Sequence, residues 1–472
     1  MAIYDRLSAQ DRSFLELEGP SSHMHVAGCF IFERGELSTA AGGVDIDKLR
    51  DYVASRLHRI PRYRQRIAWI PVENHPVWVD DDRFNIHYHV RHTGLPAPGD
   101  DRQLKRFCGR VMSQQLDRGK PLWEMWVVEG LEHDRFALVC KTHHCMVDGI
   151  SGVDLLAVLL SPTPDKDFEA APRWLPNPAP SGAVLLRDAM LRRVELPIAL
   201  AGVVGAAMRD PEGTLARVSE TVTALGETLQ TAISPATDTP LNRPIGPHRR
   251  FDWVGFDVEE VKKVKNALGG TVNDVVLATV AGAVGRFLEQ RGIPYARQRA
   301  MDFRAFCPVS VRSASERGAL GNRVSGMIAK LPIAETKPQR RLDRVRAITR
   351  QLKESKQALG AAVLTSVSEW TAPTLATMAS RLAFENRTAN MVVTNVPGPQ
   401  IPLYLLGARM AETYPMVPLF ASQGLGIALF SYAGGLYWGF VCDWDQFPDL
   451  HDFVCAIDAS FRELCDAADA AS

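Results

Sequence analysis

The sequence predicts an α/β protein, because strand and helix patterns alternate through both halves of the chain. Phe136 to Thr142 alternates apolar and other residues with period two, as a strand does. Asp47 to Leu57 instead repeats its apolar residues with a helical period. The 472 residues, of which 46% are hydrophobic, are enough to bury a large core and to form more than one domain.

A change in composition divides the chain. Ser161 to Ser181 is rich in proline and predicts an irregular linker. Two helical patterns follow, an apolar one over Ala183–Met208 and an amphipathic one over Thr214–Ile233. We therefore predict three parts: an N-terminal subdomain (1–160), a linker with a helical crossover (161–240) and a C-terminal subdomain (241–472).

The second half contains further helices and strands. Val258–Leu268 is predicted to be a helix that stops at Gly269, and Thr271 is a candidate N-cap for the next helix. Strand patterns cover Arg304–Val311, Met391–Thr394, Gly426–Tyr432 and Leu436–Cys442. Pro308 predicts a sheet edge or strand end, and Asn395–Pro399 predicts a turn.

Charge and cysteine content exclude several classes of protein. With 54 basic and 54 acidic residues the formal net charge is zero, which is not typical of nucleic-acid binding. The eight cysteines contain no C-x-x-C pair, so reduced thiols and a cytoplasmic location are expected. The N-terminus lacks an apolar signal core, and the uncharged stretch Leu196–Met208 is shorter than the about 20 residues of a bilayer span.

The most informative motif follows the strand predicted over Phe136–Thr142. His143 and His144 precede Asp148 and Gly149 in the pattern H-H-x-x-x-D-G. Strand alternation would send the two imidazoles to opposite faces, so they cannot share one function. A histidine at a strand end, beside a helix N-terminus that disfavours its charged form, suits proton abstraction from a hydroxyl. The glycine allows close approach of backbone or substrate, and the carboxylate is favoured where a helix begins.

Other chemistries have less support. The His-His-Cys sequence at 143–145 lacks the spaced partners of a zinc site, so no metal is expected. His23-x-His25 and His87-x-His89 are more often ordinary strand residues than ligands. The sequence contains no G-x-S-x-G elbow, phosphate-binding loop or dinucleotide motif, which disfavours hydrolases, kinases and dinucleotide-dependent oxidoreductases.

On the H-H-x-x-x-D-G motif the chain resembles the CoA-dependent acyltransferases with the chloramphenicol acetyltransferase fold, a superfamily that includes the condensation domains of peptide synthetases. Other segments narrow the resemblance to bacterial wax ester synthase/diacylglycerol acyltransferases. They are Leu7-Ser8-Ala9-Gln10-Asp11 with Phe14-Leu15, Met24-His25-Val26, Pro121-Leu122-Trp123, Asn273-Asp274, Pro308-Val309-Ser310-Val311-Arg312, Gly321-Asn322 and Asn395-Val396-Pro397-Gly398-Pro399. The ordered set spans nearly the whole chain.

This resemblance implies a fold and a mechanism. Two chloramphenicol-acetyltransferase-like subdomains would be joined by a crossover, with a tunnel between them. His144 would be the general base that takes the hydroxyl proton of a diacylglycerol or a long-chain alcohol. The alkoxide would attack a long-chain acyl-CoA directly and form triacylglycerol or wax ester. His143 and Asp148 would support the loop, and Gly149 completes the motif.

Substrate-binding candidates come from the other matched segments. They are Pro121, Leu122, Trp123, Asn273, Asp274 and Asn395. Core packing is an equal alternative for the Pro-Leu-Trp segment, and turn formation before proline is an alternative for Asn395. Acyl-CoA is expected as a co-substrate, with no cofactor.

The expected substrates are insoluble, and the helical patterns between 183 and 233 are apolar or amphipathic. Peripheral association with the inner membrane face or with lipid inclusions is therefore expected. Two alternative functions stay open: a condensation-type enzyme that uses an amine or a carrier-bound thioester, and a non-catalytic lipid-binding relative. A glycerol-phosphate type of acyltransferase also matches H-x-x-x-x-D through His143 and Asp148, but the doubled histidine and Gly149 argue against it.

Overall fold

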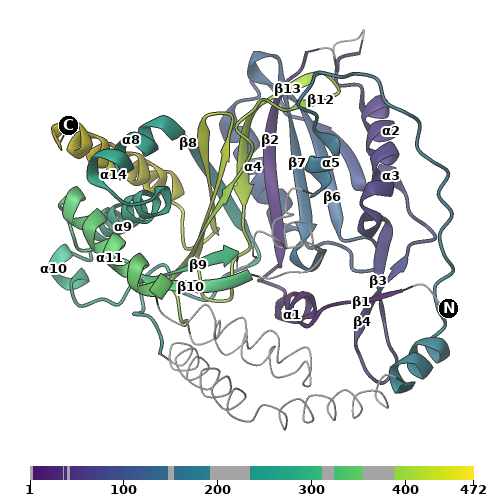
Figure 1. The fold of residues 1–472 in the computed structure, drawn as a ribbon, viewed down its shortest axis with the longest axis horizontal. Coiled ribbons are helices and arrows are strands. Elements are labelled where there is room, and N and C mark those ends of the chain that lie inside the picture. The colour runs from purple at the N-terminus through teal and green to yellow at the C-terminus, as the bar shows by residue number, and fades with distance from the viewer. Residues whose placement is uncertain are drawn as a thin grey trace, which may run out of the picture.

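Two six-stranded sheets lie at the centre of the computed structural model, with most of the helices on their outer sides (Figure 1). The structure describes residues 4–35, 37–39, 43–146, 154–191, 234–310, 324–354 and 387–471. The first sheet consists of β12 (Tyr404–Leu405), β13 (Ala408–Met416), β2 (His25–Glu33), β7 (Arg135–His143), β6 (Trp123–Leu131) and β5 (Val90–Gly94), in that order. The second consists of β10 (Val324–Lys330), β9 (Arg304–Ser310), β11 (Met391–Pro397), β14 (Leu425–Tyr432), β15 (Gly435–Asp443) and β8 (Arg249–Asp257).

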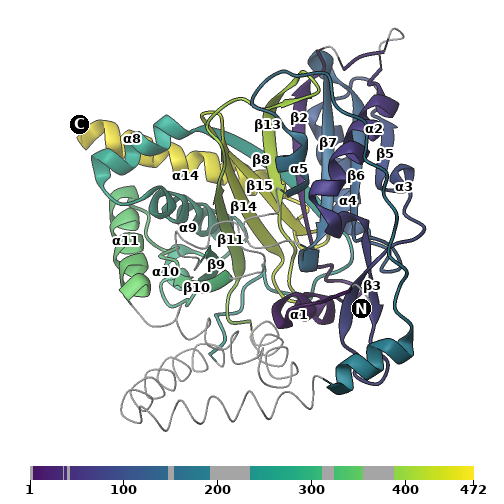
Figure 2. The ribbon, with the colours of Figure 1, turned by 45° about the vertical axis from the view of Figure 1, so that its right-hand side comes forward.

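Each sheet shares a hydrophobic core with its own helices. The first half has α1 (Ala9–Leu17), α2 (Ile46–Arg56), α3 (Ile86–His89), α4 (Asp101–Ser113), α5 (Asp154–Leu159) and the 3-10 helices η1 (Leu57–Arg59), η2 (Pro61–Arg64), η3 (Glu132–Asp134) and η4 (His144–Met146). The second half has α8 (Val258–Leu268), α9 (Val272–Gln290), α10 (Tyr295–Gln298), α11 (Pro338–Glu354) and α14 (Leu450–Ala471). In the second half, α9 is buried between the sheet and its neighbouring helices α11 and α14 (Figure 2).

The second half of the chain contributes two strands to the first sheet. β12 and β13 belong by sequence to the predicted C-terminal part, 241–472, yet β13 pairs with β2 in the first sheet, from Met410 opposite Phe32 to Met416 opposite Ala27. An apolar cluster that includes Cys108 of α4 and residues of β2, β8, β13 and β15 fills the space between the sheets. The separation of the subdomains along the sequence is therefore incomplete in space.

Several predicted elements are confirmed. α8 ends at Leu268 because Gly269 follows with a φ of 82°, a backbone conformation that favours glycine. Thr271 caps α9 in a reciprocal capping box with Asp274. β14 and β15 form the predicted hairpin, with positive φ at Ala433 and Gly434 in its turn.

The predicted turn over Asn395–Pro399 is partly wrong, because β11 continues to Pro397. Parallel pairing with β14 holds this strand as far as Pro397 opposite Ser431. On its other side β11 pairs with β9 only at Met391 and Val392, so no described strand pairs with that side where the proline occurs. Pro308 of β9 lies beyond the same short pairing, and among the described residues only β10 pairs with it. β9 is the second strand of the sheet, so the predicted edge is found only locally, near the end of this strand.

The proline-rich segment 161–181 contains no helix or strand apart from a single bridge between Ser161 and Tyr404, as predicted. Residues 182–191 are helical and pack on a small third sheet of β1 (Asp5–Arg6), β4 (Pro76–Asp80) and β3 (Gln65–Trp69). The rest of the predicted crossover, 192–233, lies outside the described residues.

Two further findings concern membranes and thiols. No single helix in the described part of the chain is long and apolar enough to span a membrane. α8 and α9 pass that test only as a pair bent by 95°. All eight cysteines are free.

Candidate active site

The histidine motif lies where β7 ends. β2 and β7 pair in antiparallel fashion, which places His25 opposite His143. β7 ends at His143, and η4 begins with His144. His143 is fully buried, whereas His144 is half-buried, so the two imidazoles have different surroundings.

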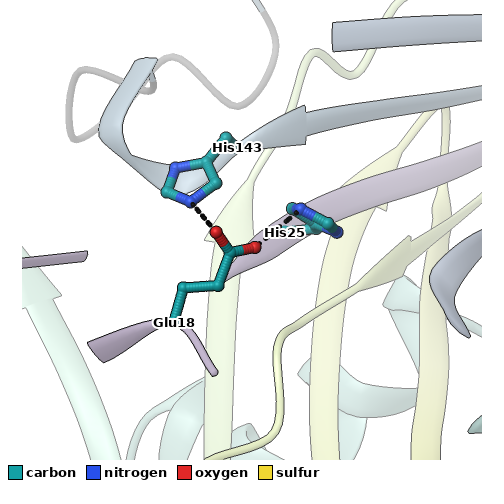
Figure 3. A group of neighbouring side chains, drawn as sticks. All are labelled: Glu18, His25 and His143. Atoms are coloured by element: carbon teal, nitrogen blue, oxygen red, sulfur yellow. Dashed lines mark ion pairs between the residues drawn. The ribbon is translucent and has the colours of Figure 1, made fainter. Parts of the chain in front are cut away.

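A buried carboxylate, Glu18, lies between two imidazoles (Figure 3). Glu18 follows the last residue of α1, and its Oε1 and Oε2 lie 3.3 Å from Nε2 of His25 and 3.5 Å from Nε2 of His143. Burial lowers the pKa of both histidines, that of His25 to about 3. Both rings are therefore neutral at physiological pH and turn an N–H toward the carboxylate.

Arg118 supplies the charge that balances Glu18. Its guanidinium donates two hydrogen bonds to Oε2 of Glu18, from Nε at 2.9 Å and from Nη2, and a third to the Leu15 carbonyl at 2.8 Å. Burial alone would raise the pKa of Glu18, but hydrogen bonds and charge interactions with His143 and His25 hold it well below its usual range. The cluster therefore contains an ionised carboxylate paired with a guanidinium and flanked by two neutral imidazoles.

The tautomer of His143 follows from its two neighbours. The backbone N–H of Cys145 donates to Nδ1 of His143 at 3.1 Å, so Nδ1 carries no proton. The proton of the neutral ring is then on Nε2, the atom that faces Glu18. His143 thus links Glu18 to the backbone of η4, the turn that contains His144.

His144 is held by stacking and by its backbone. Its ring stacks on Phe14 of α1 with centroids 3.9 Å apart. Its backbone N–H donates to the Met24 carbonyl at 2.7 Å. Nδ1 of His144 is buried without a well-formed hydrogen bond to any described residue. Burial lowers the pKa of His144 to about 4, an effect that its own carbonyl weakens and His143 strengthens. The ring is therefore unprotonated at neutral pH and can accept a proton.

The Glu18 cluster also has the residue types of a metal site. The nearest ligand atoms of Glu18, His25 and His143 lie within 4.8 Å of one another. However, Arg118 already binds the carboxylate, and a guanidinium at that place repels a cation. We interpret the cluster as a polar support for the motif, in which Arg118 donates to Glu18 and two imidazoles face the carboxylate; the absence of a metal stays a prediction.

The Pro-Leu-Trp segment supports the same strand end. Pro121, Leu122 and Trp123 are buried. The Leu122 carbonyl accepts a hydrogen bond from the backbone N–H of His143 at 2.9 Å. The Trp123 indole donates to the Tyr63 carbonyl at 2.8 Å and stacks on His89 with centroids 4.6 Å apart. These contacts give the segment a packing function, while its contact with substrate stays a prediction.

The remaining substrate-binding candidates lie on the second half. Asn273 and Asp274 are in the first turn of α9, and Asn395 is a half-buried residue of β11. Asp274 accepts hydrogen bonds from Thr271 and, at 2.6 Å, from the hydroxyl of Thr349. Its acceptor oxygens are therefore used within the fold.

Asp148 and Gly149 lie outside the described residues, so their predicted roles stay predictions. Three residues that the sequence does not single out join the motif: Phe14, Glu18 and Arg118. Phe14 occurs only within a matched segment, and the pattern around His25 indicates an ordinary strand residue. Pairing β2 with β7 in register would have placed His25 beside His143, but no local pattern predicts that pairing.

Comparison with known proteins gives matches that together cover most of the chain. The model of the wax ester synthase/diacylglycerol acyltransferase catalytic domain matches residues 7–276, and the model of that family's C-terminal domain matches residues 320–465. Among solved structures, the wax ester synthase/diacylglycerol acyltransferase from Marinobacter aquaeolei VT8 has a TM-score of 0.70 at 24% identity, over 98% of this chain and 99% of that one. The first condensation domain of the calcium-dependent antibiotic synthetase has a TM-score of 0.59 at 17% identity, over 99% and 97% of the two chains. These two likenesses confirm the fold that the resemblance implied.

Two Mycobacterium tuberculosis relatives named as diacylglycerol O-acyltransferases are closer in sequence. One is 34% identical over 99% of this chain and 91% of its own length. The other is 31% identical over 98% of this chain and 96% of its own length. The chain therefore belongs to the wax ester synthase/diacylglycerol acyltransferase family, and it is an acyltransferase.

Proposed function

We propose that this protein transfers a long-chain acyl group from acyl-CoA to the hydroxyl of a diacylglycerol, or of a long-chain fatty alcohol, and so forms triacylglycerol or wax ester. The observation that carries the proposal is His144, a neutral, half-buried imidazole fixed at a strand end by Phe14 and the Met24 carbonyl. The names of the relatives support diacylglycerol as an acceptor, and the name of the family supports a fatty alcohol as the other.

In the proposed mechanism His144 acts as a general base. An imidazole nitrogen takes the hydroxyl proton while the oxygen attacks the thioester carbonyl and forms a tetrahedral intermediate. Collapse of this intermediate breaks the C–S bond, and the imidazolium returns its proton to the CoA thiolate. No acyl-enzyme is formed. Base catalysis of this kind contributes about 10²–10⁴-fold to the rate, and alignment of the two substrates contributes further.

The lowered pKa of His144 suits this role in one respect. A base that is neutral at working pH needs no prior deprotonation, so nearly all enzyme molecules are competent above about pH 5. The same shift makes the ring a weaker base, so proton transfer has to accompany attack on the thioester rather than precede it. Direct transfer between two bound substrates meets that requirement.

The surroundings of the reaction are part of the proposal. Acyl-CoA serves as a co-substrate, and no cofactor takes part. We propose a cytoplasmic protein that works at the inner membrane face or on lipid inclusions, because its substrates are insoluble in water.

The alternative of a condensation-type enzyme that uses an amine or a carrier-bound thioester rests on similarity of fold at 17% identity, and no feature of the described part of the site favours an amine. The alternative of a non-catalytic lipid-binding relative predicts no turnover. One assay separates all three possibilities: purified protein receives labelled palmitoyl-CoA with dipalmitoylglycerol, hexadecanol or hexadecylamine, and products are separated by thin-layer chromatography. We expect triacylglycerol or wax ester; amide alone would favour the condensation type, and no product would favour the lipid-binding relative.

A further inference from the structure

One short segment contacts both histidines of the motif. Phe14 of α1 stacks on the ring of His144 at 3.9 Å, and Glu18, directly after α1, faces Nε2 of His143 at 3.5 Å. A few residues later the Met24 carbonyl accepts a hydrogen bond from the backbone N–H of His144. Residues 14–25, which we call the N-terminal clamp, therefore contact both histidines of the motif; Figure 3 shows the part of the clamp at Glu18 and His25 with His143.

The clamp is itself anchored at both ends. Arg118 binds Glu18 and the Leu15 carbonyl, and the hydroxyl of Ser22 donates to the Leu419 carbonyl at 2.8 Å. Arg249 of the second half donates to the Ser21 carbonyl. The clamp is thus anchored to Arg118 in the first half and, through Ser21 and Ser22, to the second half.

We propose that Glu18, paired with Arg118, is a positioning residue that fixes the tautomer of His143 and thereby the turn that aims His144; this inference rests on the proposed function. Accepting the Nε2 proton leaves Nδ1 of His143 free to receive the N–H of Cys145. That bond is the link between the buried cluster and η4. If Nδ1 carried the proton instead, two N–H groups would face each other and the turn would have to move.

The carboxylate does more than an uncharged acceptor would. Its two oxygens face the N–H groups of His25 and His143 at 3.3 and 3.5 Å, and Arg118 shares one of these oxygens. A glutamine has one acceptor oxygen, so its amide NH₂ would meet one of the three donors. A leucine would leave both imidazole N–H groups without this acceptor and would leave Arg118 with the Leu15 carbonyl.

The test uses two variants of the clamp and one matched control in the full chain. Glu18→Leu removes both acceptor oxygens, and Glu18→Gln keeps one. Glu16→Gln makes the same change of charge two residues earlier, where Glu16 pairs with Arg12 one turn away on α1. For each protein we would measure kcat and KM for palmitoyl-CoA and dipalmitoylglycerol, thermal unfolding, and the tautomers of His143 and His144 from ¹⁵N NMR without substrate.

We expect the effect on kcat rather than on KM, because the clamp orients the base and is not expected to contact substrate. Glu18→Leu should lower kcat about 100-fold, the usual cost of misplacing a reacting group by about 1 Å, with KM within about 3-fold of wild type. Glu18→Gln should lower kcat by about 10-fold, and Glu16→Gln by less than about 2-fold. The NMR signals of His143 should move from the Nε2–H form in Glu18→Leu and stay unchanged in Glu16→Gln.

Two results would overturn the inference: a folded Glu18→Leu protein with wild-type kcat, or a lower kcat with the tautomer of His143 unchanged. If Glu18→Leu does not fold, Glu18→Gln decides, since wild-type kcat and tautomer in that variant would overturn the inference equally. The proposed function fails separately. A wild-type protein that forms no ester would refute it, whereas the NMR result without substrate would still show whether Glu18 fixes His143.

Discussion

Each half of the molecule buries a charged group, but the two groups are satisfied to different degrees. In the second half, Arg341 is 2% exposed and donates to the carbonyls of Ala278 and Glu335 and to the side chains of Ser460 and Glu463. Three of these four hydrogen bonds tie α11 to α9 and α14. A buried cation with this many partners stabilises the packing of three helices.

The polar atoms of the Glu18 cluster in the first half have fewer hydrogen-bond partners than Arg341 has. Among the described residues, Oε1 of Glu18, both ring nitrogens of His25, Nε2 of His143 and Nδ1 of His144 are buried without a well-formed hydrogen bond. Contacts of 3.3 and 3.5 Å orient these groups without satisfying them fully. We infer from this difference that the Arg341 network serves stability. The Glu18 cluster instead keeps buried polar atoms without full hydrogen bonding, which lowers stability and is common at functional sites.

The largest expected effect concerns His144. His144→Ala should lower kcat by about 10²–10⁴-fold, because the base is lost while both substrates still bind. The melting temperature should fall little or even rise, since the substitution removes a buried nitrogen that has no partner among the described residues. Steady-state ester formation and thermal unfolding check both parts. Near-normal turnover would exclude His144 as the base. A large fall in melting temperature would show that His144, like Arg341, serves stability.

The opposite pattern is expected for Arg341. Arg341→Met should lower the free energy of unfolding by about 3–5 kcal/mol, because it leaves the partners of a buried cation unsatisfied. The folded fraction should keep its kcat. Denaturant unfolding together with activity at low temperature measures the two quantities.

A matched control for Arg341 lies on the same helix. Arg344 is mostly exposed on α11 and forms an ion pair with Glu335 at 3.2 Å. Arg344→Met should therefore lower the free energy of unfolding by less than about 1 kcal/mol, as is usual for an exposed ion pair. Equal losses of stability in the two variants would show that the buried network of Arg341 has no special weight.

Much of the fold could be predicted because its signals are local. Gly269 and Thr271 mark the boundary between α8 and α9 with a positive φ and a capping box, and both are visible in the sequence. The placement of β13 beside β2 could not be predicted in this way. That pairing joins Met416 to Ala27 across most of the chain, and no local pattern specifies it.

The candidate site likewise contains residues that a local motif predicts and residues that only the fold brings together. His143 and His144 can be found from the sequence because a motif names them and a strand pattern precedes them. Arg118 and Glu18 are 100 residues apart in sequence, and neither belongs to a matched motif. The position of Asn395 on β11 likewise comes only from the structure, because the sequence there predicts a turn.

The dependence of activity on pH should distinguish His144 from an ordinary histidine. The unprotonated form is the base, and burial lowers its pKa to about 4, so kcat/KM should hold from neutral pH to about pH 5 and fall through about pH 4. A base with the usual pKa of about 6.5 would lose about 30-fold at pH 5. A fall centred near pH 6.5 would contradict the buried setting of His144.

Stability has to be followed in the same experiment. The pKa of His25 is also lowered, to about 3, so its contribution to stability is complete above its unfolded pKa of about 6.5 and is lost as pH falls toward 3. The melting temperature should therefore decline below about pH 6.5 while kcat/KM is still constant. If both quantities fell together, unfolding rather than titration of His144 would explain the loss of activity.

A small expected effect tests whether Asp274 resembles Arg341 or the Glu18 cluster. Asp274 is 4% exposed, and its oxygens accept from Thr271 and Thr349 at 2.6 to 2.8 Å, so it has the complete partners of a structural group. Asp274→Asn should cost about 1 kcal/mol through the weakened cap of α9, with KM for both substrates unchanged. Asn273→Ala is the matched comparison, because Asn273 is half-buried on the same turn and is the better candidate for substrate contact. A higher KM for Asp274→Asn at unchanged stability would show that Asp274 contributes to substrate binding rather than to the structure.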